Sequence, residues 1–463
     1  MSSTAPEAGE HIVIVGASLA GLRAAEALRA AGHRGPLALV DAEDAEPYDR
    51  PPLSKQVLMG MAPPDATRLP RLHDLGDVTW VRGVAATGLD RVGREVRLAD
   101  GATLAYDRVL VATGVRNRPW PDPGAADLEG IVSVRTAGDA ARLQELLQPR
   151  PRRVLVVGGG FTGSEIASVC RSLGLDVTLL ERGPSPLSGA LGGVFGEVMA
   201  TVQHEHGVDL RCGVEVARFE ADAAGRVRSV VLSDGGSIEA DVVVLALGAV
   251  RNVEWLEGSG LAVGPNGVSA DAGCRVFDQG GLVVDDVFVA GDVARFPHAA
   301  FEYQFLSLEH WENAVTMAQV AAHNMVCASI DRVAHLTIPS FWSIQFGLNI
   351  KSVGVPSFAD EVLFAVGSVE QRRFVVAYGR QGRLVAAVTV DQAKWLDHYR
   401  AGIERAAPLD EGLRADDGPT PDAPIAAGYP HPSVPYHLPS ALVSGHDPLE
   451  MRANIPRRPR GTA

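Results

Sequence analysis

The sequence predicts an α/β fold built from two similar βαβ units, followed by a smaller α+β domain. A short apolar strand, a glycine-rich turn and an alanine-rich helix open the chain between residues 11 and 31. The same order of strand, glycine-rich turn and helix returns between residues 153 and 173. From residue 332 to about residue 396, segments of alternating apolar and polar residues indicate antiparallel strands instead.

Length and composition are typical of a multidomain globular protein. At roughly 100–200 residues per domain, 463 residues correspond to two or three domains. No apolar run approaches the roughly 18 residues needed to span a membrane. The polar, acidic N-terminus lacks the features of a signal peptide. We therefore expect a cytoplasmic protein without a membrane partner.

Charge and cysteine content exclude several other classes. The net charge is −14 and no concentrated basic face is evident, so nucleic acid is not an expected partner. The four cysteines, Cys170, Cys212, Cys274 and Cys327, lie far apart and form no CxxC motif. A disulfide scaffold and a zinc site are therefore not expected, and we predict no metal site.

The first βαβ unit carries an irregular glycine motif. A strand at residues 11–15 runs into Gly16-Ala17-Ser18-Leu19-Ala20-Gly21, where Ser18 takes the place of the usual second glycine. A helix extends to about Ala31, and a second strand at residues 37–40 ends at an acid. Asp41 and Glu43 are the two candidates for binding a ribose at that strand end.

The second βαβ unit carries the regular motif Gly158-x-Gly160-x-x-Gly163. The first glycine permits a tight turn, the second lets the backbone approach a pyrophosphate, and the third allows close packing of helix and strand. The N-terminus of the adjoining helix supplies free N–H groups for phosphates. Glu181, at the end of the next strand, is placed to bind ribose hydroxyls. A turn without a ligand is the competing interpretation, and strand, helix and acid together favour dinucleotide binding.

Two such units in one chain suggest that one bound nucleotide donates a hydride to another. FAD with a nicotinamide dinucleotide is the usual combination. The predicted fold is therefore two Rossmann-like dinucleotide-binding domains, for FAD and NAD, plus a small α+β C-terminal domain. Later strands end in Ala112-Thr113-Gly114, in Gly248 and in Gly291-Asp292. We predict an FAD domain at 1–118 and 251–330, an NAD domain at 119–250, a C-terminal domain at 331–407 and a proline-rich, extended or disordered tail at 408–463.

The sequence resembles the oxygenase-coupled, NADH-dependent ferredoxin reductases, flavoproteins related to the disulfide reductases but without the redox-active disulfide. The resemblance covers roughly residues 11–400. It is carried by Arg50-Pro51-Pro52-Leu53-Ser54-Lys55, Ala112-Thr113-Gly114-Val115-Arg116, the segment from Gly158 to Glu165, Ala290-Gly291-Asp292-Val293-Ala294, His310-Trp311-x-Asn313-Ala314 and Phe341-Trp342-Ser343-x-Gln345-Phe346-Gly347.

The resemblance implies FAD and NADH as cofactors and assigns their contacts. The acid that the family usually carries after the second strand falls on Ala42, so Asp41 or Glu43 must take its role. The implied cofactor-binding residues are Gly16, Ser18, Ala20, Gly21, Asp41, Glu43, Arg50, Lys55, the backbone at Ala86, Ala112, Thr113, Gly114, Arg135, Gly158, Gly160, Phe161, Thr162, Gly163, Glu165, Glu181, Gly248, Gly291, Asp292 and Trp311.

Three of these residues have implied catalytic roles. Lys55 and Glu165 correspond to a lysine–glutamate pair beside the flavin N5 atom and the nicotinamide. A lysine there stabilises the anionic reduced flavin, and the carboxylate keeps it in place. Trp311 would lie against the flavin ring near the electron exit. The alternatives are a surface lysine and a core tryptophan.

The absence of an early cysteine indicates how electrons leave. Related disulfide reductases carry cysteines on the helix that comes after the second strand, whereas the first cysteine here is Cys170. Electrons must then pass singly to an external carrier, and an iron–sulfur ferredoxin that serves an oxygenase, such as a haem monooxygenase, is the matching partner. The four cysteines lack iron–sulfur ligand spacing, so the cluster is not expected in this chain.

One acidic residue and a group of arginines bear on the choice of nicotinamide nucleotide and on the docking surface. Glu181 predicts preference for NADH because a carboxylate repels the 2′-phosphate of NADPH, although the adjacent Arg182 softens this. A basic patch for an acidic ferredoxin is expected. Its candidates are Arg295, Arg372, Arg373, Arg380 and Arg383, with an ordinary solvated hairpin as the alternative. The competing functions are a rubredoxin reductase, an NADH oxidase and a redox sensor resembling apoptosis-inducing factor.

Overall fold

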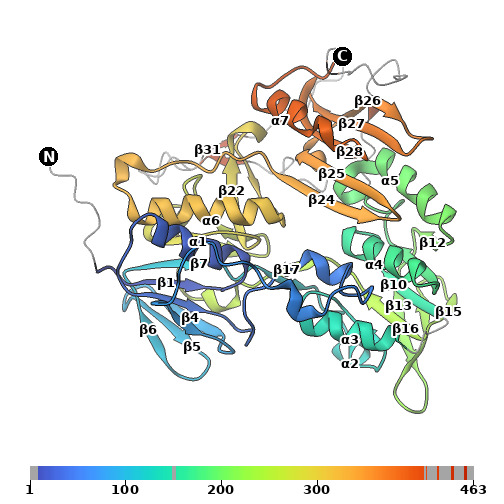
Figure 1. Cartoon of the computed structure of the whole chain (residues 1–463), viewed down its shortest axis with the longest axis horizontal. Helices are drawn as coiled ribbons and strands as arrows, with labels where there is room; N and C mark the ends of the chain where they lie inside the picture. Colours follow the sequence, from blue (N-terminus) through green and yellow to red (C-terminus); the bar gives the residue numbers. More distant parts are fainter. Residues whose placement is uncertain are drawn as a thin grey trace.

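The structure is a computed structural model that describes residues 9–148, 153–410, 413, 425–426, 440–442 and 453–455. Two sheets of mainly parallel strands and one antiparallel sheet, each with its own helices, form its main parts (Figure 1). The α/β class with a C-terminal α+β domain is confirmed.

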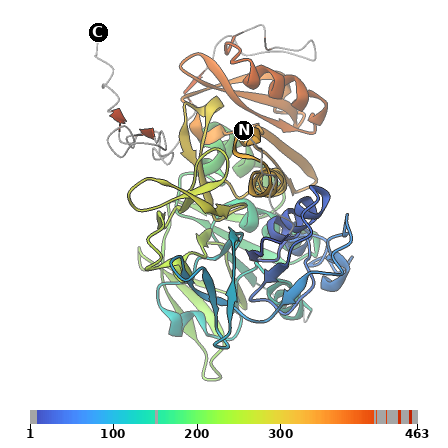
Figure 2. The ribbon, with the colours of Figure 1, turned by 90° about the vertical axis from the view of Figure 1, so that its left-hand side faces the viewer.

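The first parallel sheet begins with the predicted βαβ unit. Strand β1 (Ile12–Val15), helix α1 (Leu19–Ala30) and β2 (Leu37–Val40) come in this order. The strand order is β20–β21–β7–β1–β2–β3, with β3 at Thr79–Val81, β7 at Arg108–Val111, β20 at Arg275–Phe277 and β21 at Val283–Val289. The sheet thus combines an early and a late part of the chain. Helix α6 (Trp311–Val326) packs against α1 on one face of it (Figures 1 and 2).

The second parallel sheet repeats this plan. Strand β10 (Arg153–Val157), α4 (Phe161–Ser172) and β11 (Asp176–Glu181) form the second βαβ unit. The order is β12–β11–β10–β16–β9, with β9 at Ile131–Val132, β12 at Asp209–Cys212 and β16 at Val242–Leu245. Helices α3 (Ala137–Leu147) and α5 (Ser188–Glu205) flank it. Fully buried Val and Leu on these central strands explain the continuous apolar runs in the sequence.

Each unit also inserts a three-stranded antiparallel meander directly before the parallel strand that pairs with the first strand of its βαβ motif, β7 in the first unit and β16 in the second. In the first unit it comprises β4 (Ala86–Asp90), β5 (Glu95–Leu98) and β6 (Thr103–Ala105). In the second it comprises β13 (Val216–Ala221), β14 (Val227–Leu232) and β15 (Ser237–Glu239). The duplication therefore extends well beyond the βαβ motif seen in the sequence.

Two smaller sheets connect these parts. Strands β8 (Val115–Asn117) and β17 (Ala249–Arg251) pair antiparallel where the chain crosses between the two units. The other sheet contains β18 (Val263–Gly264), β19 (Gly267–Ser269), β22 (Ala294–His298) and β23 (Gln304–Leu306).

The C-terminal sheet is antiparallel, in the order β24–β25–β28–β27–β26–β29. Its strands are β24 (Ser340–Gln345), β25 (Leu348–Gly354), β26 (Glu361–Ser368), β27 (Arg373–Arg380), β28 (Arg383–Val390) and β29 (Ile425–Ala426), and α7 (Leu396–Glu404) packs on it. The β27–β28 hairpin agrees with the antiparallel strands predicted there, and it turns at Gln381-Gly382, with φ of 53° and 73°.

The C-terminal domain extends past the predicted boundary at residue 407. Leu409 and Leu413 are buried in the core, and Ile425–Ala426 adds an edge strand beside β26. These segments complete the domain instead of belonging to a tail, so the predicted boundary is corrected for them. Most of residues 408–463 lies outside the described residues.

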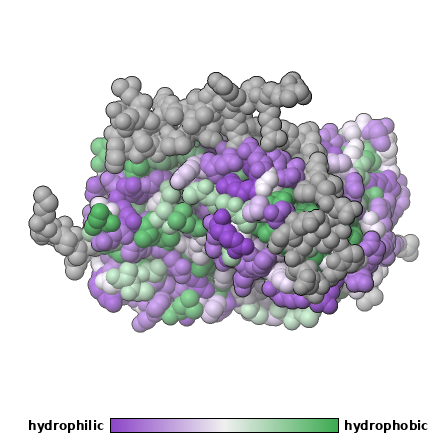
Figure 3. Space-filling view, turned by 90° about the horizontal axis from the view of Figure 1, so that it is seen from above, coloured by the Kyte–Doolittle hydropathy of each residue, from purple (hydrophilic) through white to green (hydrophobic). Residues whose placement is uncertain are grey.

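A continuous apolar core joins the first sheet, α6 and the C-terminal sheet, and two smaller cores cover the two faces of the second sheet. On the face shown in Figure 3, hydrophilic and hydrophobic side chains are interspersed over the described surface. In the described part of the chain, no helix is both long and apolar enough to cross a membrane.

Candidate dinucleotide site

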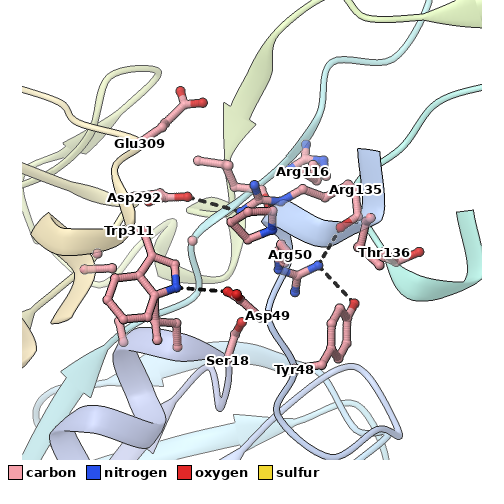
Figure 4. A pocket seen from close by; sticks show the side chains of 18 of the residues that line it. Ser18, Tyr48, Asp49, Arg50, Arg116, Arg135, Thr136, Asp292, Glu309 and Trp311 are labelled. Carbon is pink, nitrogen blue, oxygen red and sulfur yellow. Dashed lines mark hydrogen bonds and ion pairs between the residues drawn. The ribbon is translucent and has the colours of Figure 1, made fainter. Parts of the chain in front are cut away.

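A cavity of about 430 Å³ opens between the first parallel sheet, the second unit and the C-terminal sheet (Figure 4). Sixteen of the predicted cofactor-binding residues line it: Gly16, Ser18, Ala20, Asp41, Glu43, Arg50, Lys55, Ala112, Thr113, Gly114, Arg135, Thr162, Glu165, Gly291, Asp292 and Trp311. Residues from separate stretches of the chain therefore meet at the carboxyl ends of the parallel strands, where α/β sheets bind ligands.

The other predicted residues lie outside this lining. Ala86 begins β4 in the first meander, and Gly21 lies inside α1. Gly158, Gly160, Phe161, Gly163, Glu181 and Gly248 belong to the second unit. The structure thus brings most residues of the first motif together with Thr162 and Glu165 of α4, and leaves the other residues of the second unit outside the lining.

Close backbone packing explains the glycines of the first turn. A Cβ atom on Gly16 would lie 2.2 Å from the carbonyl oxygen of Ala112, and one on Gly21 would lie 1.9 Å from that of Gly16. Ser18 is the N-cap of α1, yet its side chain makes no capping hydrogen bond. The N–H groups of the first helical turn therefore remain available for a phosphate.

The acid that ends the second strand of each unit binds its own glycine-rich loop. Asp41 accepts a hydrogen bond from the Ala17 N–H at 2.9 Å, and Glu181 accepts one from the Gly159 N–H at 2.7 Å. Burial raises the pKa of Asp41. Both carboxylates therefore fix the loop beside the helix N-terminus, at the strand end where a ribose would lie.

Glu43 is engaged differently. Its two oxygens accept from Arg50 and from the Tyr48 hydroxyl, each at 2.6 Å. Burial opposes ionisation, but Arg50 and the Tyr48 hydrogen bond outweigh it and hold the pKa of Glu43 below its usual value. Arg50 also donates to the Arg135 carbonyl at 2.8 Å. Glu43 therefore anchors Arg50 at the cavity wall. Figure 4 shows Arg50 there with its bonds to Tyr48 and to the Arg135 backbone.

Arg135 and Asp292 form an ion pair at 3.1 Å across the cavity wall. Arg135 also donates to the Val115 carbonyl, so it spans from β8 to the turn after β21. Burial raises the pKa of Asp292 despite the neighbouring guanidinium. The pair joins the turn between β9 and α3 of the second unit to the late part of the first unit at the cavity.

The Lys55–Glu165 pair lies between the two units. The Lys55 ammonium is 2.6 Å from a Glu165 oxygen, although the residues are 110 positions apart. Their side chains are 11% and 8% exposed. Lys55 comes directly after the 3-10 turn Pro51–Ser54, and Glu165 lies on α4 directly after the second glycine motif. The pair that the sequence resemblance implies is therefore formed.

Trp311 begins α6 and lines the cavity. Its indole N–H donates to Asp49 at 2.9 Å, and its ring makes an edge contact with Trp342, with centroids 6.2 Å apart. Burial raises the pKa of Asp49. Trp342 is 39% exposed, so two aromatic rings connect the cavity to the surface.

Several functional candidates were missed from the sequence. Asp49, Tyr48, Ser54, Trp342 and Ser343 all contact predicted site residues, and two of them, Ser54 and Ser343, contact Glu165. Most lie within or beside the Arg-Pro-Pro-Leu-Ser-Lys and Phe-Trp-Ser strings, which marked their positions but not their partners.

The expected basic docking patch is wrong in one part. The Arg380 side chain is only 3% exposed, stacks on Phe358 and pairs with Glu302. Arg383 lies 3.7 Å from the same carboxylate. Arg372 is paired with Glu205. These pairings neutralise much of the charge on the hairpin.

The lining fits an extended dinucleotide. It includes the acids Asp41 and Glu43, the Gly16–Ala20 loop, and Lys55 with Trp311. Gly160 in the second unit has open space where a Cβ atom would stand, as close approach of a pyrophosphate requires. The donors and acceptors present therefore suit FAD in the first unit and a nicotinamide dinucleotide in the second.

Known proteins share this arrangement. Residues 10–318 match the family described as pyridine nucleotide-disulphide oxidoreductase, and residues 340–420 match a reductase C-terminal domain. Rhodocoxin reductase of Rhodococcus erythropolis is 34% identical over 394 residues, covering 84% of this chain and 88% of the relative. The ferredoxin–NAD(+) reductase component of the anthranilate 1,2-dioxygenase system of Burkholderia cepacia is 34% identical over 412 residues, covering 88% and 97%.

A solved structure of similar shape is the covalent putidaredoxin reductase–putidaredoxin complex. It superposes with a TM-score of 0.82 at 29% identity, covering 89% of this chain and 97% of that chain. This chain therefore belongs to the pyridine nucleotide-disulphide oxidoreductase family and carries its reductase-type C-terminal domain.

Proposed function

We propose that this protein is an NADH-dependent ferredoxin reductase that supplies electrons to an oxygenase, such as a haem monooxygenase, through an iron–sulfur ferredoxin. The observation that carries the proposal is the buried Lys55–Glu165 pair, formed where the two dinucleotide units meet. When bound, FAD accepts a hydride from NADH at its N5 atom and releases the two electrons singly.

The residues of the first unit bind and orient the flavin cofactor. The α1 N-terminus and its glycine-rich loop bind the pyrophosphate, and Asp41 fixes that loop. Lys55 presents an ammonium at the ring end of the cavity, where it stabilises negative charge on the reduced ring. Glu165 keeps the ammonium in place.

The second unit binds the nicotinamide nucleotide. The Gly158–Gly163 turn and the α4 N-terminus accept the pyrophosphate. Glu181, at the end of β11, would favour NADH over NADPH by repelling a 2′-phosphate on the adenosine ribose. Because Glu165 lies on α4, the same helix that binds the nucleotide also carries a residue of the reacting site.

Electron exit is direct. None of the residues described around the cavity is a cysteine, and Cys170 and Cys274 are buried with raised thiol pKa values. A thiol relay has no participant there. Trp311 and Trp342 instead bring the ring end of the cavity close to the surface, where a ferredoxin docks. The names of the relatives, among them a reductase solved in complex with putidaredoxin, support this partner.

Dependence on NADH and free cysteines support a cytoplasmic location.

The test is NADH-driven cytochrome c reduction by the purified yellow protein, with and without small ferredoxins of different cluster types. A large ferredoxin-dependent rate is expected. Fast flavin reduction without any ferredoxin-dependent increase would refute the ferredoxin assignment and favour an NADH oxidase or a rubredoxin reductase. Slow flavin reduction with a long-lived charge-transfer band would favour a redox sensor.

A further inference from the structure

Strand β24 is the point where the C-terminal sheet meets the site. From Trp342 to Gln345 its residues alternate between two environments, as in a half-buried strand. Trp342 and Ile344 are 39% and 46% exposed, whereas Ser343 and Gln345 are fully buried. Two fully buried polar side chains on one face need an explanation, because burying unpaired polar groups is unfavourable.

The Ser343 side chain contacts the carboxylate of the Lys55–Glu165 pair. Its hydroxyl donates to one oxygen of Glu165 at 2.6 Å. The other oxygen accepts from Lys55 at 2.6 Å and from the Ser54 hydroxyl at 2.7 Å. The carboxylate therefore has partners from the first unit on one oxygen and from the C-terminal sheet on the other.

Gln345 orients the Ser343 hydroxyl. Its amide N–H donates to the Ser343 oxygen at 3.0 Å. A hydroxyl has one proton and accepts with its remaining lone pairs. With the amide donating to its oxygen, Ser343 has its proton directed at Glu165. The two buried polar residues on this face of β24 thus act in series on one carboxylate.

The surrounding contacts keep β24 at a fixed place. The Phe346 N–H, directly after the strand, donates to the Ser168 hydroxyl on α4 at 2.7 Å. Phe341 packs edge-on against Phe161, with ring centroids 4.8 Å apart. The strand is therefore fixed on α4 at both ends, and the Ser343 hydroxyl has a defined position relative to Glu165.

We propose that Ser343 is a positioning residue, through which the C-terminal domain holds Glu165, and through Glu165 the Lys55 ammonium, in the geometry needed for hydride transfer from NADH. This inference rests on the proposed function. In that step the C4–H bond of NADH breaks with its electron pair, the hydride forms a bond to flavin N5, and NADH becomes NAD⁺. Ser343 touches neither reactant and acts only through the carboxylate.

The chain offers a matched control for Ser343→Ala. Ser352 on the neighbouring strand β25 is also buried, at 1% exposure, and its hydroxyl has no hydrogen-bond partner within the described chain. Ser352→Ala therefore removes the same atom from the same sheet without touching Glu165. Ser343→Thr keeps the hydroxyl and serves as the rescue variant, and Gln345→Met removes only the orienting amide.

The first measurement is anaerobic stopped-flow reduction of the FAD-loaded enzymes by NADH. We expect Ser343→Ala to lower the limiting rate constant about tenfold, equal to about 1.4 kcal/mol of activation free energy. Ser343→Thr should recover most of this rate, Gln345→Met should be intermediate, and Ser352→Ala should match the wild type. Equal rates for Ser343→Ala and Ser352→Ala would overturn the proposal.

The second measurement does not depend on turnover. The sequence contains only three lysines, Lys55, Lys351 and Lys394, so acylation with an acetyl ester and peptide mass spectrometry can monitor each one. In Ser343→Ala, loss of the hydrogen bond should loosen the pair and raise the Lys55 rate by about threefold or more. Lys351 pairs directly across from Trp342 and reports on β24 itself. A higher acylation rate at Lys55 alone would support the role of Ser343 in positioning the pair. Equal increases in the acylation rates of Lys55 and Lys351 would mean that the strand has loosened and would overturn the proposal.

The two proposals fail in different ways. If NADH does not reduce the wild-type flavin, the proposed function is wrong, whatever the variants do. If the wild type is reduced rapidly and Ser343→Ala behaves like Ser352→Ala in both measurements, only the role of Ser343 is wrong. If Ser343→Ala does not fold, Gln345→Met and Ser343→Thr carry the same test, because both keep an oxygen at position 343.

Discussion

The Lys55–Glu165 pair allows a thermodynamic prediction, since it is both charged and nearly enclosed. The variants are Lys55→Met, Glu165→Gln and the double variant, all close in volume to the residues that they replace. Lys55→Met leaves the carboxylate with two hydroxyl donors, Ser54 and Ser343. Glu165→Gln removes the negative charge beside the ammonium, whose contacts outside position 165 are the Pro51 carbonyl at 3.2 Å and the Ser54 hydroxyl at 3.4 Å.

The expected losses of unfolding free energy depend on the contacts that remain in each variant. Breaking a buried ion pair by removing one partner costs about 3–5 kcal/mol. Lys55→Met should lower the free energy of unfolding by about 3 kcal/mol, because the Glu165 carboxylate remains hydrogen-bonded. Glu165→Gln should lower it by about 5 kcal/mol, because the Lys55 ammonium is poorly compensated. The double variant removes both charges, so its loss should fall short of the sum by up to about 3 kcal/mol.

The assay is thermal unfolding in excess FAD, monitored by tryptophan and flavin fluorescence. At roughly 2 °C per kcal/mol for a chain of this size, Lys55→Met should melt about 6 °C lower and Glu165→Gln about 10 °C lower. The double variant should melt well above the value that addition predicts. Single variants with melting temperatures indistinguishable from the wild type, or strictly additive effects, would refute the claim that the two charges compensate each other in the folded protein.

Three further predictions concern specificity, electron exit and pH. Glu181→Ala should narrow the preference for NADH over NADPH in kcat/KM, because the lost repulsion at ~4 Å is worth roughly 1–4 kcal/mol. Asp49→Ala removes the acceptor of the Trp311 indole and should slow ferredoxin reduction about tenfold while flavin reduction by NADH stays unchanged. Burial lowers the pKa of His310 and of His335 to about 4, so the unfolded chain binds more protons between about pH 6.5 and pH 4. The free energy of unfolding, measured with urea, should therefore have its full value above about pH 6.5. It should fall by about 3 kcal/mol per histidine on acidification to about pH 4.

Each of these predictions has a result that contradicts it. An unchanged NADH to NADPH ratio in Glu181→Ala would place the ribose elsewhere. Equal slowing of both half-reactions in Asp49→Ala would assign the residue to cofactor binding and not to electron exit. For the histidines, His335→Phe should flatten the pH dependence between about pH 6.5 and pH 4, and an unaltered slope would show that other groups cause it.

The sequence determined the parts of the fold that depend on local chemistry. The two glycine-rich turns, their flanking strands and the acids at the strand ends are set by steric and hydrogen-bonding demands that act over about twenty residues. The observed β1–α1–β2 and β10–α4–β11 units lie close to the predicted boundaries. The β27–β28 hairpin was also predictable, because two alternating segments on either side of a glycine-containing stretch are a local signal.

Tertiary structure alone decided which of these parts meet. Asp41 and Glu43 looked equivalent in the sequence, and only folding showed that one fixes the glycine-rich loop while the other anchors Arg50. Arg380 looked like a docking charge, but its strand turned it inward onto Phe358. Ser343 lies 178 residues from Glu165, and no pattern in the chain connects them. Local chemistry depends on near neighbours in the sequence, whereas burial and long-range partners depend on how separate sheets pack, and that packing brings Lys55, Glu165 and Ser343 to a single point.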